Sequence, residues 1–171
     1  ADVIWEKGTN RVAFAKGEIQ KYNWVDIGSS FLMSELQAAY LFGQLEKTDL
    51  IQQKRKLLCD VYVRSLKSLK EKVFITIDTA TSNASILYFF CKNKTERDAL
   101  ISFLQQKGIL AVFHYLPLHL SSYYLQKHPP ESLPMSEKYA ETIVRIPLFY
   151  DLQPEDAGYI SAVIDSFFTK K

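Results

Sequence analysis

The sequence predicts an α/β protein in which a long helical segment leads into a small α/β domain, and three observations support this fold class. Residues 36–70 contain no proline and a single glycine, and apolar residues recur in them at helical spacing. From residue 73 onward, short apolar stretches alternate with stretches of helical period, which is typical of a compact α/β unit. The 171 residues are 47% hydrophobic and 23% charged, a globular composition that suffices for one domain or two small ones.

Residues 1–30 show no clear period, and they predict irregular structure or a short strand. Turn signals recur in this stretch at Gly8, Gly17 and Gly28. Four interleaved aromatic residues argue against disorder: Trp5, Phe14, Tyr22 and Trp24. An ordered stretch of this length without a period is usually a functional loop or a contact surface.

A helical segment follows, and Ser34 is its expected N-cap. Ser34 and Gln37 have the spacing of a capping box, in which each side chain binds the other residue's backbone N–H. The segment, placed at 35–72, is either one long helix or two helices with a kink. A continuous helix of about 35 residues would reach ~50 Å, so we expect it to bridge two lobes.

Residues 73–171 predict alternating strands and helices. Strands are expected where short apolar runs occur, at 73–77, 86–91, 109–116 and 145–150. Thr95 and Asp98 have capping-box-like spacing, which predicts a helix that starts at Thr95 and ends at Gly108. Further helices are expected at 136–144 and at 154–168.

Charge and cysteine content exclude several classes of protein. The 21 Lys and Arg residues stand against 19 Asp and Glu, and a formal net charge of +2 is too weak to predict binding to nucleic acid or membranes. No apolar run approaches the ~20 residues of a membrane-spanning helix, and no secretory leader opens the sequence. Cys59 and Cys91 form no C-x-x-C pair, so we expect no structural zinc, and two free thiols predict a reducing cytoplasm. The start at Ala1 fits either removal of an initiator Met or truncation.

The histidines are the first candidates for chemistry. In a continuous strand, His114 and His119 would lie on opposite sides, and no third ligand is evident, so no metal site is expected. Tyr115 and His119 share strand parity and would line one wall of a pocket. The alternative, which the residues alone favour, is a packed strand edge with a solvent-facing histidine. Neither cysteine has a local feature that would lower its pKa, so no catalytic thiol is expected.

Ser29 and Ser30 follow Gly28 ahead of the helical segment and form the strongest candidate for an anion site. Hydroxyls, backbone N–H groups and a helix dipole would converge there. The alternative is a plain capping turn. The aromatic run at 87–90 lacks the glycines and basic residue of an RNA-stacking strand, so we expect it to be core.

Four segments together resemble one family. They are WEKGTNR at 5–11, KYNWVDIGSS at 21–30, LMSELQAAY at 32–40 with QLE at 44–46, and VFHYLPLH at 112–119. In this order they are similar to the sugar-nucleotide 4-aminotransferases of the DegT/DnrJ/EryC1/StrS family. The resemblance covers essentially the whole chain and implies the C-terminal part of a pyridoxal phosphate (PLP)-dependent transferase of fold type I.

The resemblance implies a homodimeric enzyme that transfers an amino group from L-glutamate to C4 of a dTDP-4-keto-6-deoxyhexose. In this family the Schiff-base lysine lies upstream of the segment that matches 5–11, and no lysine here stands in a matching position. The resemblance therefore implies that this chain holds no catalytic residue, binds no PLP covalently and does not transaminate alone. The competing hypothesis is a non-catalytic α/β binding or interaction module.

Site roles follow from the resemblance by position. Ser29 and Ser30 are expected to meet the PLP phosphate across the dimer. Leu32 departs from the Asn or Arg that many relatives carry there, which shifts the phosphate contact toward the serines. The remaining expected contacts are to the sugar nucleotide and comprise Tyr22, Trp24, Tyr115 and His119.

The resemblance also implies a division of the chain. Residues 1–34 would pack on a large cofactor domain and on the partner subunit, residues 35–72 would form the interdomain helix, and residues 73–171 the small α/β domain. We accordingly expect exposed apolar side chains that promote self-association, at Trp5, Phe14, Trp24 and Phe31.

Overall fold

The computed structural model describes residues 1–30, 32–69 and 82–169, and the chain divides into two compact units. The units are Ala1–Thr48 and Asp49–Lys171, and each is described by itself. The strand expected at 73–77 lies outside the described residues. No helix in the described ranges has both the length and the apolar character needed to cross a bilayer.

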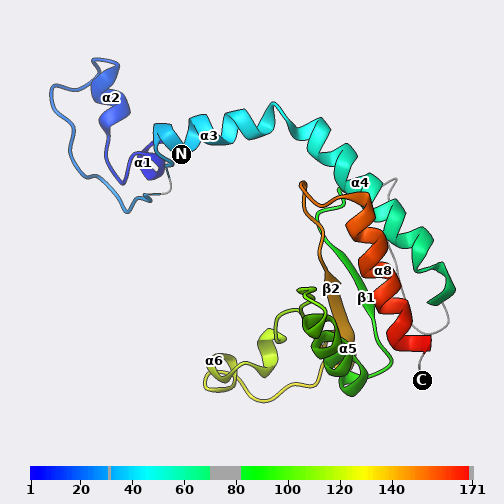
Figure 1. The fold of residues 1–171 in the computed structure, drawn as a ribbon. Coiled ribbons are helices and arrows are strands. Elements are labelled where there is room, and N and C mark those ends of the chain that lie inside the picture. The colour runs from blue at the N-terminus through cyan, green and yellow to red at the C-terminus, as the bar shows by residue number, and fades with distance from the viewer. Residues whose placement is uncertain (31, 70–81, 170–171) are drawn as a thin grey trace. The chain divides into compact units, whose positions relative to one another are not determined.

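The first unit contains three helices, of which two are short: α1 (Asp2–Trp5), α2 (Arg11–Ala15) and α3 (Glu35–Leu45) (Figure 1). The expectation of irregular or stranded structure over residues 1–30 was therefore wrong for α1 and α2. An isolated antiparallel bridge between Thr9 and Trp24 joins the loop after α1 to the long connection before α3. The predicted capping box at Ser34 and Gln37 is confirmed, with both reciprocal hydrogen bonds formed.

Two glycines allow these loops of the first unit to meet. Gly8 has φ +83°, and a Cβ built on it would overlap the Asp26 carbonyl oxygen. A Cβ on Gly28 would overlap the backbone nitrogen of Gly8. The Val25 and Asp26 amides both donate to the Gly8 carbonyl, at 2.8 and 3.1 Å. Only glycine permits backbone segments to approach this closely.

Two helices occupy the helical segment, so the second of the two alternatives holds. Helix α3 ends at Leu45, and α4 (Thr48–Ser65) begins three residues later. Asp49 in the first turn of α4 and Arg64 in its last turn suit the helix dipole. A short 3₁₀ turn, η1 (Lys67–Leu69), follows α4.

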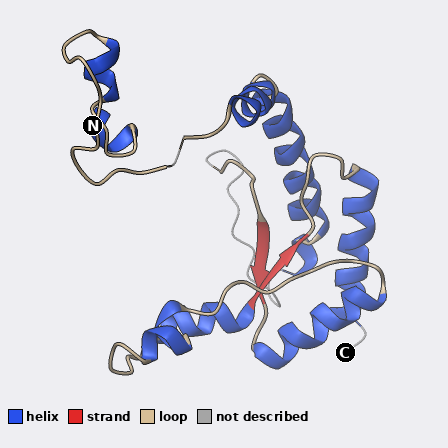
Figure 2. Ribbon diagram, turned by 90° about the vertical axis from the view of Figure 1, so that its left-hand side faces the viewer, coloured by secondary structure: helices blue, strands red, loops and turns tan. Residues whose placement is uncertain are grey.

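The second unit is built on an antiparallel strand pair, β1 (Leu87–Phe90) and β2 (Ile143–Ile146). Figure 2 shows both strands in red, with helices beside them. The register pairs Leu87 with Ile146 and Tyr88 with Arg145. Because side chains alternate along a strand, Leu87 and Ile146 face the core, whereas Tyr88 and Arg145 face the opposite side.

The predicted strand at 109–116 was wrong in its extent. Val112 forms one isolated antiparallel bridge with Arg145, and the pairing stops there. Two hydrogen bonds between their backbones, of 3.0 and 2.7 Å, make this bridge. Strand β2 therefore has β1 on one side and the bridge on the other.

The helices of the second unit are α5 (Lys94–Gln106), α6 (Ser122–Leu125), α7 (Pro134–Thr142) and α8 (Pro154–Thr169), with a 3₁₀ turn η2 (Leu118–Leu120). The expected cap at Thr95 was wrong, since Asn93 Oδ1 accepts the Glu96 amide at 2.9 Å. Gly108, at φ +74°, follows α5 as predicted. The helix expected at 136–144 starts earlier, at Pro134, and gives way to β2 at Ile143.

The core of the second unit lies between the β1–β2 strand pair on one side and the helices on the other. Apolar residues from three helices and both strands are fully or almost fully buried in it, among them Leu58, Tyr62, Phe89, Leu100, Leu104, Val144 and Ile164. The Tyr62 hydroxyl donates to the Pro147 carbonyl at 2.9 Å and ties α4 to the chain after β2. The aromatic run at 87–90 is thus part of the core on one face, as predicted.

Candidate functional site

The predicted site residues fall in two groups, one in each unit. Tyr22, Trp24, Ser29 and Ser30 belong to the first unit, and Tyr115 and His119 belong to the second. The geometry within each group separates side chains that are open to a ligand from side chains that hold the fold together.

Tyr22 and Trp24 present open aromatic surface. The Trp24 side chain is 74% exposed although its backbone takes part in the bridge to Thr9. Tyr22 is 46% exposed and packs its ring against Phe14, with 5.6 Å between ring centroids. Exposed aromatic faces of this kind suit packing against a sugar or a base.

Ser29 and Ser30 differ in what their hydroxyls do. The Ser29 hydroxyl and the Ser29 amide both donate to the Ile4 carbonyl, at 3.2 and 3.0 Å, and the residue is half-buried. Ser30 is exposed, and its hydroxyl has no hydrogen-bond partner among the described residues. Ser29 therefore fastens the connection to the end of α1, whereas Ser30 has a hydroxyl free to bind a ligand.

The helix N-terminus lies four residues beyond Ser30, at the position that the sequence predicts. Helix α3 begins at Glu35, and Ser34 rather than Ser30 caps it. The helix dipole falls off within the first turn, so it does not add to the Ser30 position. Of the features expected to hold a phosphate, the segment thus offers the Ser30 hydroxyl, which is one donor of the several that such a group needs. The described residues therefore supply one hydrogen-bond donor for the PLP phosphate and do not by themselves form a complete phosphate site.

Tyr115 and His119 are not brought together as strand neighbours. Tyr115 is 83% exposed, and His119 is 5% exposed within η2. The parity argument failed because the chain turns into a 3₁₀ helix after Pro117 instead of continuing as a strand. The alternative of a solvent-facing histidine failed for the same reason.

His119 makes a polar contact that the sequence did not predict. Its Nε2 lies 3.1 Å from Oε1 of Glu137, and the same carboxylate accepts the Leu133 amide at 2.8 Å. An ionised carboxylate only accepts, so Nε2 carries the donated proton. The Leu133 amide and, next, the hydrogen bond from His119 lower the pKa of Glu137. The pair joins η2 to the first turn of α7, which makes His119 a positioning residue in this structure.

Glu137 was not predicted as a site residue from the sequence, although one local signal for its contact with the Leu133 amide exists. It stands three residues after Pro134, the first residue of α7, where an acidic side chain can reach back to an amide before the helix. That spacing predicts the bond to Leu133. It gives no indication of the histidine 18 residues away.

The Cys59 thiol adds no nucleophile, and the described residues form no metal cluster. Cys59 is fully buried, and burial followed by the nearby Asp60 carboxylate raises the pKa of its thiol to about 11. Such a thiol stays protonated near neutral pH and is a poor nucleophile. Within the described ranges no three His, Cys, Asp or Glu side chains are grouped to hold a metal ion.

Comparison with known proteins identifies the family. Residues 5–165 match the model of the DegT/DnrJ/EryC1/StrS aminotransferase family. A dTDP-3-amino-3,4,6-trideoxy-alpha-D-glucose transaminase of Streptomyces venezuelae is 32% identical over 86% of this chain and 39% of its own length. A pleiotropic regulatory protein of Geobacillus stearothermophilus is 27% identical over 92% of this chain and 43% of its own length.

Solved structures share the fold. A putative sugar aminotransferase of Streptococcus pneumoniae in its PMP form matches with a TM-score of 0.87 at 21% identity, over 99% of this chain and 44% of its own. The Helicobacter pylori aminotransferase PseC matches with a TM-score of 0.85 at 21% identity, over 99% and 45%. These matches confirm the predicted α/β fold class, that of part of a PLP-dependent transferase. This chain spans about 40% of the length of the curated relatives, and it belongs to the DegT/DnrJ/EryC1/StrS aminotransferase family.

Proposed function

We propose that this chain is the C-terminal part of a cytoplasmic, homodimeric, PLP-dependent aminotransferase that acts on a nucleotide-linked keto sugar. The observation that carries the proposal is the family match over residues 5–165. The amino donor is L-glutamate, and the acceptor is C4 of a dTDP-4-keto-6-deoxyhexose. The product would be dTDP-4-amino-4,6-dideoxygalactose, a precursor for lipopolysaccharide-type surface polymers such as enterobacterial common antigen.

PLP supplies the electron sink for amino transfer when it is bound to such an enzyme. The residues of this chain would serve the substrate and the phosphate of the cofactor. Ser30 donates its exposed hydroxyl to the phosphate, and Tyr22 and Trp24 pack on the sugar nucleotide. In the second unit, Tyr115 presents an exposed ring that suits a sugar nucleotide, and His119, through Glu137, holds the chain after Tyr115 in place.

The serines provide a matched pair of variants that tests this assignment. Ser30→Ala removes a hydroxyl that has no partner among the described residues, whereas Ser29→Ala removes one that binds the Ile4 carbonyl. In the full-length enzyme we expect Ser30→Ala to weaken PLP binding about tenfold, the worth of one hydrogen bond to a charged group. Ser29→Ala should instead lower the unfolding temperature with a smaller change in affinity. Equal PLP affinity of Ser30→Ala and wild type, measured by absorbance titration, would remove Ser30 from the site.

The position of amination is the sharpest test of the substrate. The full-length protein with PLP and L-glutamate is offered dTDP-4-keto-6-deoxyglucose and, separately, the 3-keto isomer, and the amino sugars are identified by mass spectrometry and NMR. We expect turnover at C4. Turnover at C3 alone, which is the reaction named for the Streptomyces relative, would contradict the C4 assignment and leave the aminotransferase assignment intact.

The 171-residue chain alone should give no amino sugar and no covalent PLP label after borohydride reduction. In the family that the motifs resemble, the lysine that binds PLP precedes the segment that matches residues 5–11. Labelling of one defined lysine of this chain, together with turnover, would refute that part of the proposal.

One observation favours a second candidate. The Geobacillus relative bears the name of a regulatory protein and matches 92% of this chain. A non-catalytic binding or interaction module therefore remains the alternative. A full-length protein that binds PLP but turns over neither keto sugar would support it.

A further inference from the structure

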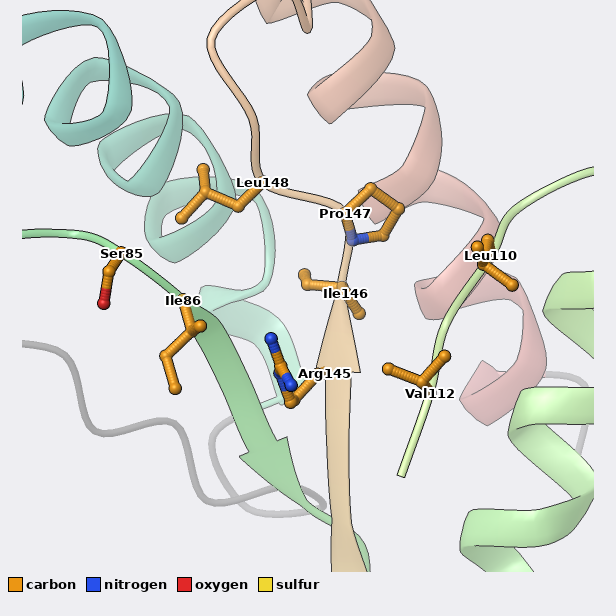
Figure 3. A pocket seen from close by; sticks show the side chains of 8 residues that line it. All are labelled: Ser85, Ile86, Leu110, Val112, Arg145, Ile146, Pro147 and Leu148. Carbon is orange, nitrogen blue, oxygen red and sulfur yellow. The ribbon is translucent and has the colours of Figure 1, made fainter. Parts of the chain in front are cut away.

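A hollow of about 190 Å³ opens in the second unit beside the strand pair, apart from the residues assigned above. Its walls come from the chain before β1, from β2 and the residues after it, and from the segment that bridges to β2. Six apolar residues, one serine and one arginine line it: Ser85, Ile86, Leu110, Val112, Arg145, Ile146, Pro147 and Leu148. Figure 3 shows the Arg145 side chain in the middle of this group, between Ile86 and Val112.

Arg145 brings a positive charge into these apolar walls, and within the described ranges no carboxylate forms an ion pair with it. Its Nε atom is buried and has no hydrogen-bond partner within the part of the chain that the structure describes. No Asp or Glu is among the described residues that line the hollow. A buried guanidinium nitrogen without a partner is costly, so its retention needs a physical reason.

The position of Arg145 is fixed by the sheet. Its backbone bridges to Val112 on one side and pairs with Tyr88 of β1 on the other. Since strand side chains alternate, this register directs the Arg145 side chain away from the helical core and toward the hollow. The charged group is therefore held on a rigid element, as a binding residue should be.

The chemistry of the hollow selects a carboxylate. A guanidinium presents parallel N–H groups that match the two oxygens of a carboxylate. One cation neutralises a monoanion, whereas a phosphate dianion among apolar walls would keep an unpaired charge. The volume equals that of about six water molecules in the liquid, which suits a carboxylate with a short apolar tail.

We propose that this hollow is a binding site for the carboxylate of a small organic acid, with Arg145 as its anion-binding group and the apolar walls holding the aliphatic part. This inference is independent of the aminotransferase assignment, because it rests on the second unit alone. Sodium butyrate, with a carboxylate and a short chain, is the probe.

The experiment is an NMR titration of the purified protein with butyrate, with its neutral isostere butyramide and with inorganic phosphate. Butyrate should shift the Arg145 Nε–H signal and the Ile86 and Val112 amides. Butyramide should bind at least about tenfold more weakly, because it lacks the charge-assisted hydrogen bonds. Absence of a shift at Arg145 Nε–H, equal binding of butyramide, or tighter binding of phosphate would each overturn the proposal.

Three variants separate the site from general effects. Arg145→Gln should abolish the preference for butyrate over butyramide. Arg64→Gln is the matched control, since Arg64 is exposed on α4 and its Nε donates to the Asp60 carbonyl. Val112→Phe fills part of the hollow while keeping the arginine, and it should block butyrate even if Arg145→Gln fails to fold. Retained binding in Val112→Phe would contradict the assigned location.

Discussion

Alkaline pH should destabilise the second unit through one buried thiol, and the size of the effect follows from the structure. Cys59 lies in the middle of α4 and is fully buried. Burial, and to a lesser degree the Asp60 carboxylate, raise its pKa from 9.0 to about 11. The unfolded chain therefore releases this proton at a lower pH than the folded chain. The free energy of unfolding is undiminished well below the unfolded pKa of 9.0, begins to fall as the pH approaches that value, and falls further as the pH rises toward 11.

The magnitude is set by the difference between the two pKa values. Two units correspond to about 2.7 kcal/mol in total, of which about half is lost by pH 10. Tyr62, one helical turn along α4, adds a smaller loss at that pH. Burial also raises its pKa, but from an ordinary value of 10.0, so its loss begins one unit higher. The thiol therefore dominates between about pH 8 and about pH 10.

Urea unfolding followed by far-ultraviolet circular dichroism measures this effect at several pH values. Cys59→Ala should cost about 1 kcal/mol at neutral pH, from lost burial, and should remove about 1.3 kcal/mol of the loss between pH 8 and pH 10. Ile164→Val, a mild change in the same core, should lower stability by about 1 kcal/mol and keep the alkaline loss. A Cys59→Ala variant with an unchanged alkaline loss would refute the assignment.

Three further predictions follow from backbone geometry and from the polar contact at α7. Gly158→Ala should stabilise α8 by about 1 kcal/mol, whereas Gly108→Ala should destabilise the protein by about 1–2 kcal/mol. Both glycines have open space for a Cβ, but only Gly108 has a positive φ, +74°. Thermal unfolding of the two variants should show a rise in the unfolding temperature for the first and a fall for the second. Gly28→Ala should cost about 1–3 kcal/mol in the first unit, and hydrogen exchange should show lost protection at the Val25 amide, which donates to a displaced carbonyl. Glu137→Gln should lower the unfolding temperature at neutral pH and make the unfolding temperature fall less steeply below about pH 4.5. The reason is that the pKa of Glu137 is lowered in the folded state, so the stability contributed by this carboxylate is lost as the pH falls through that pKa. The same dependence of unfolding temperature on acid pH in the variant and the wild type would contradict this.

Elements with local signals were predictable from the sequence. The capping box at Ser34 and Gln37 needs only residues three apart, and the helix that starts at Pro154 needs only a proline in its first turn. Errors arose where distant residues decide. The strand expected at 109–116 is limited to one bridge by its pairing with Arg145, which lies more than 30 residues away in the sequence. No period within 109–116 carries that information.

The candidate site shows the same division between local and distant causes. Resemblance of short segments identified the family, because family-specific residue types recur in a fixed order. It gave Ser29 and Ser30 the same role, since both occupy the same motif. Their difference depends on the Ile4 carbonyl, 25 residues before Ser29, which engages one hydroxyl and leaves the other exposed.

Ser29 with Ser30, and Tyr115 with His119, are two pairs of residues from the same motif that have different surroundings in the fold. Ser29 and His119 are bonded within the fold, to Ile4 and Glu137, whereas Ser30 and Tyr115 are exposed. A motif residue is retained either because it contacts the ligand or because it holds a neighbour that does, and its presence in a motif does not distinguish the two. Exposure and hydrogen-bond partners do distinguish them. Loss of activity on removal of His119 would therefore be expected even without contact to substrate, and the same loss on removal of Glu137 would identify the effect as positioning.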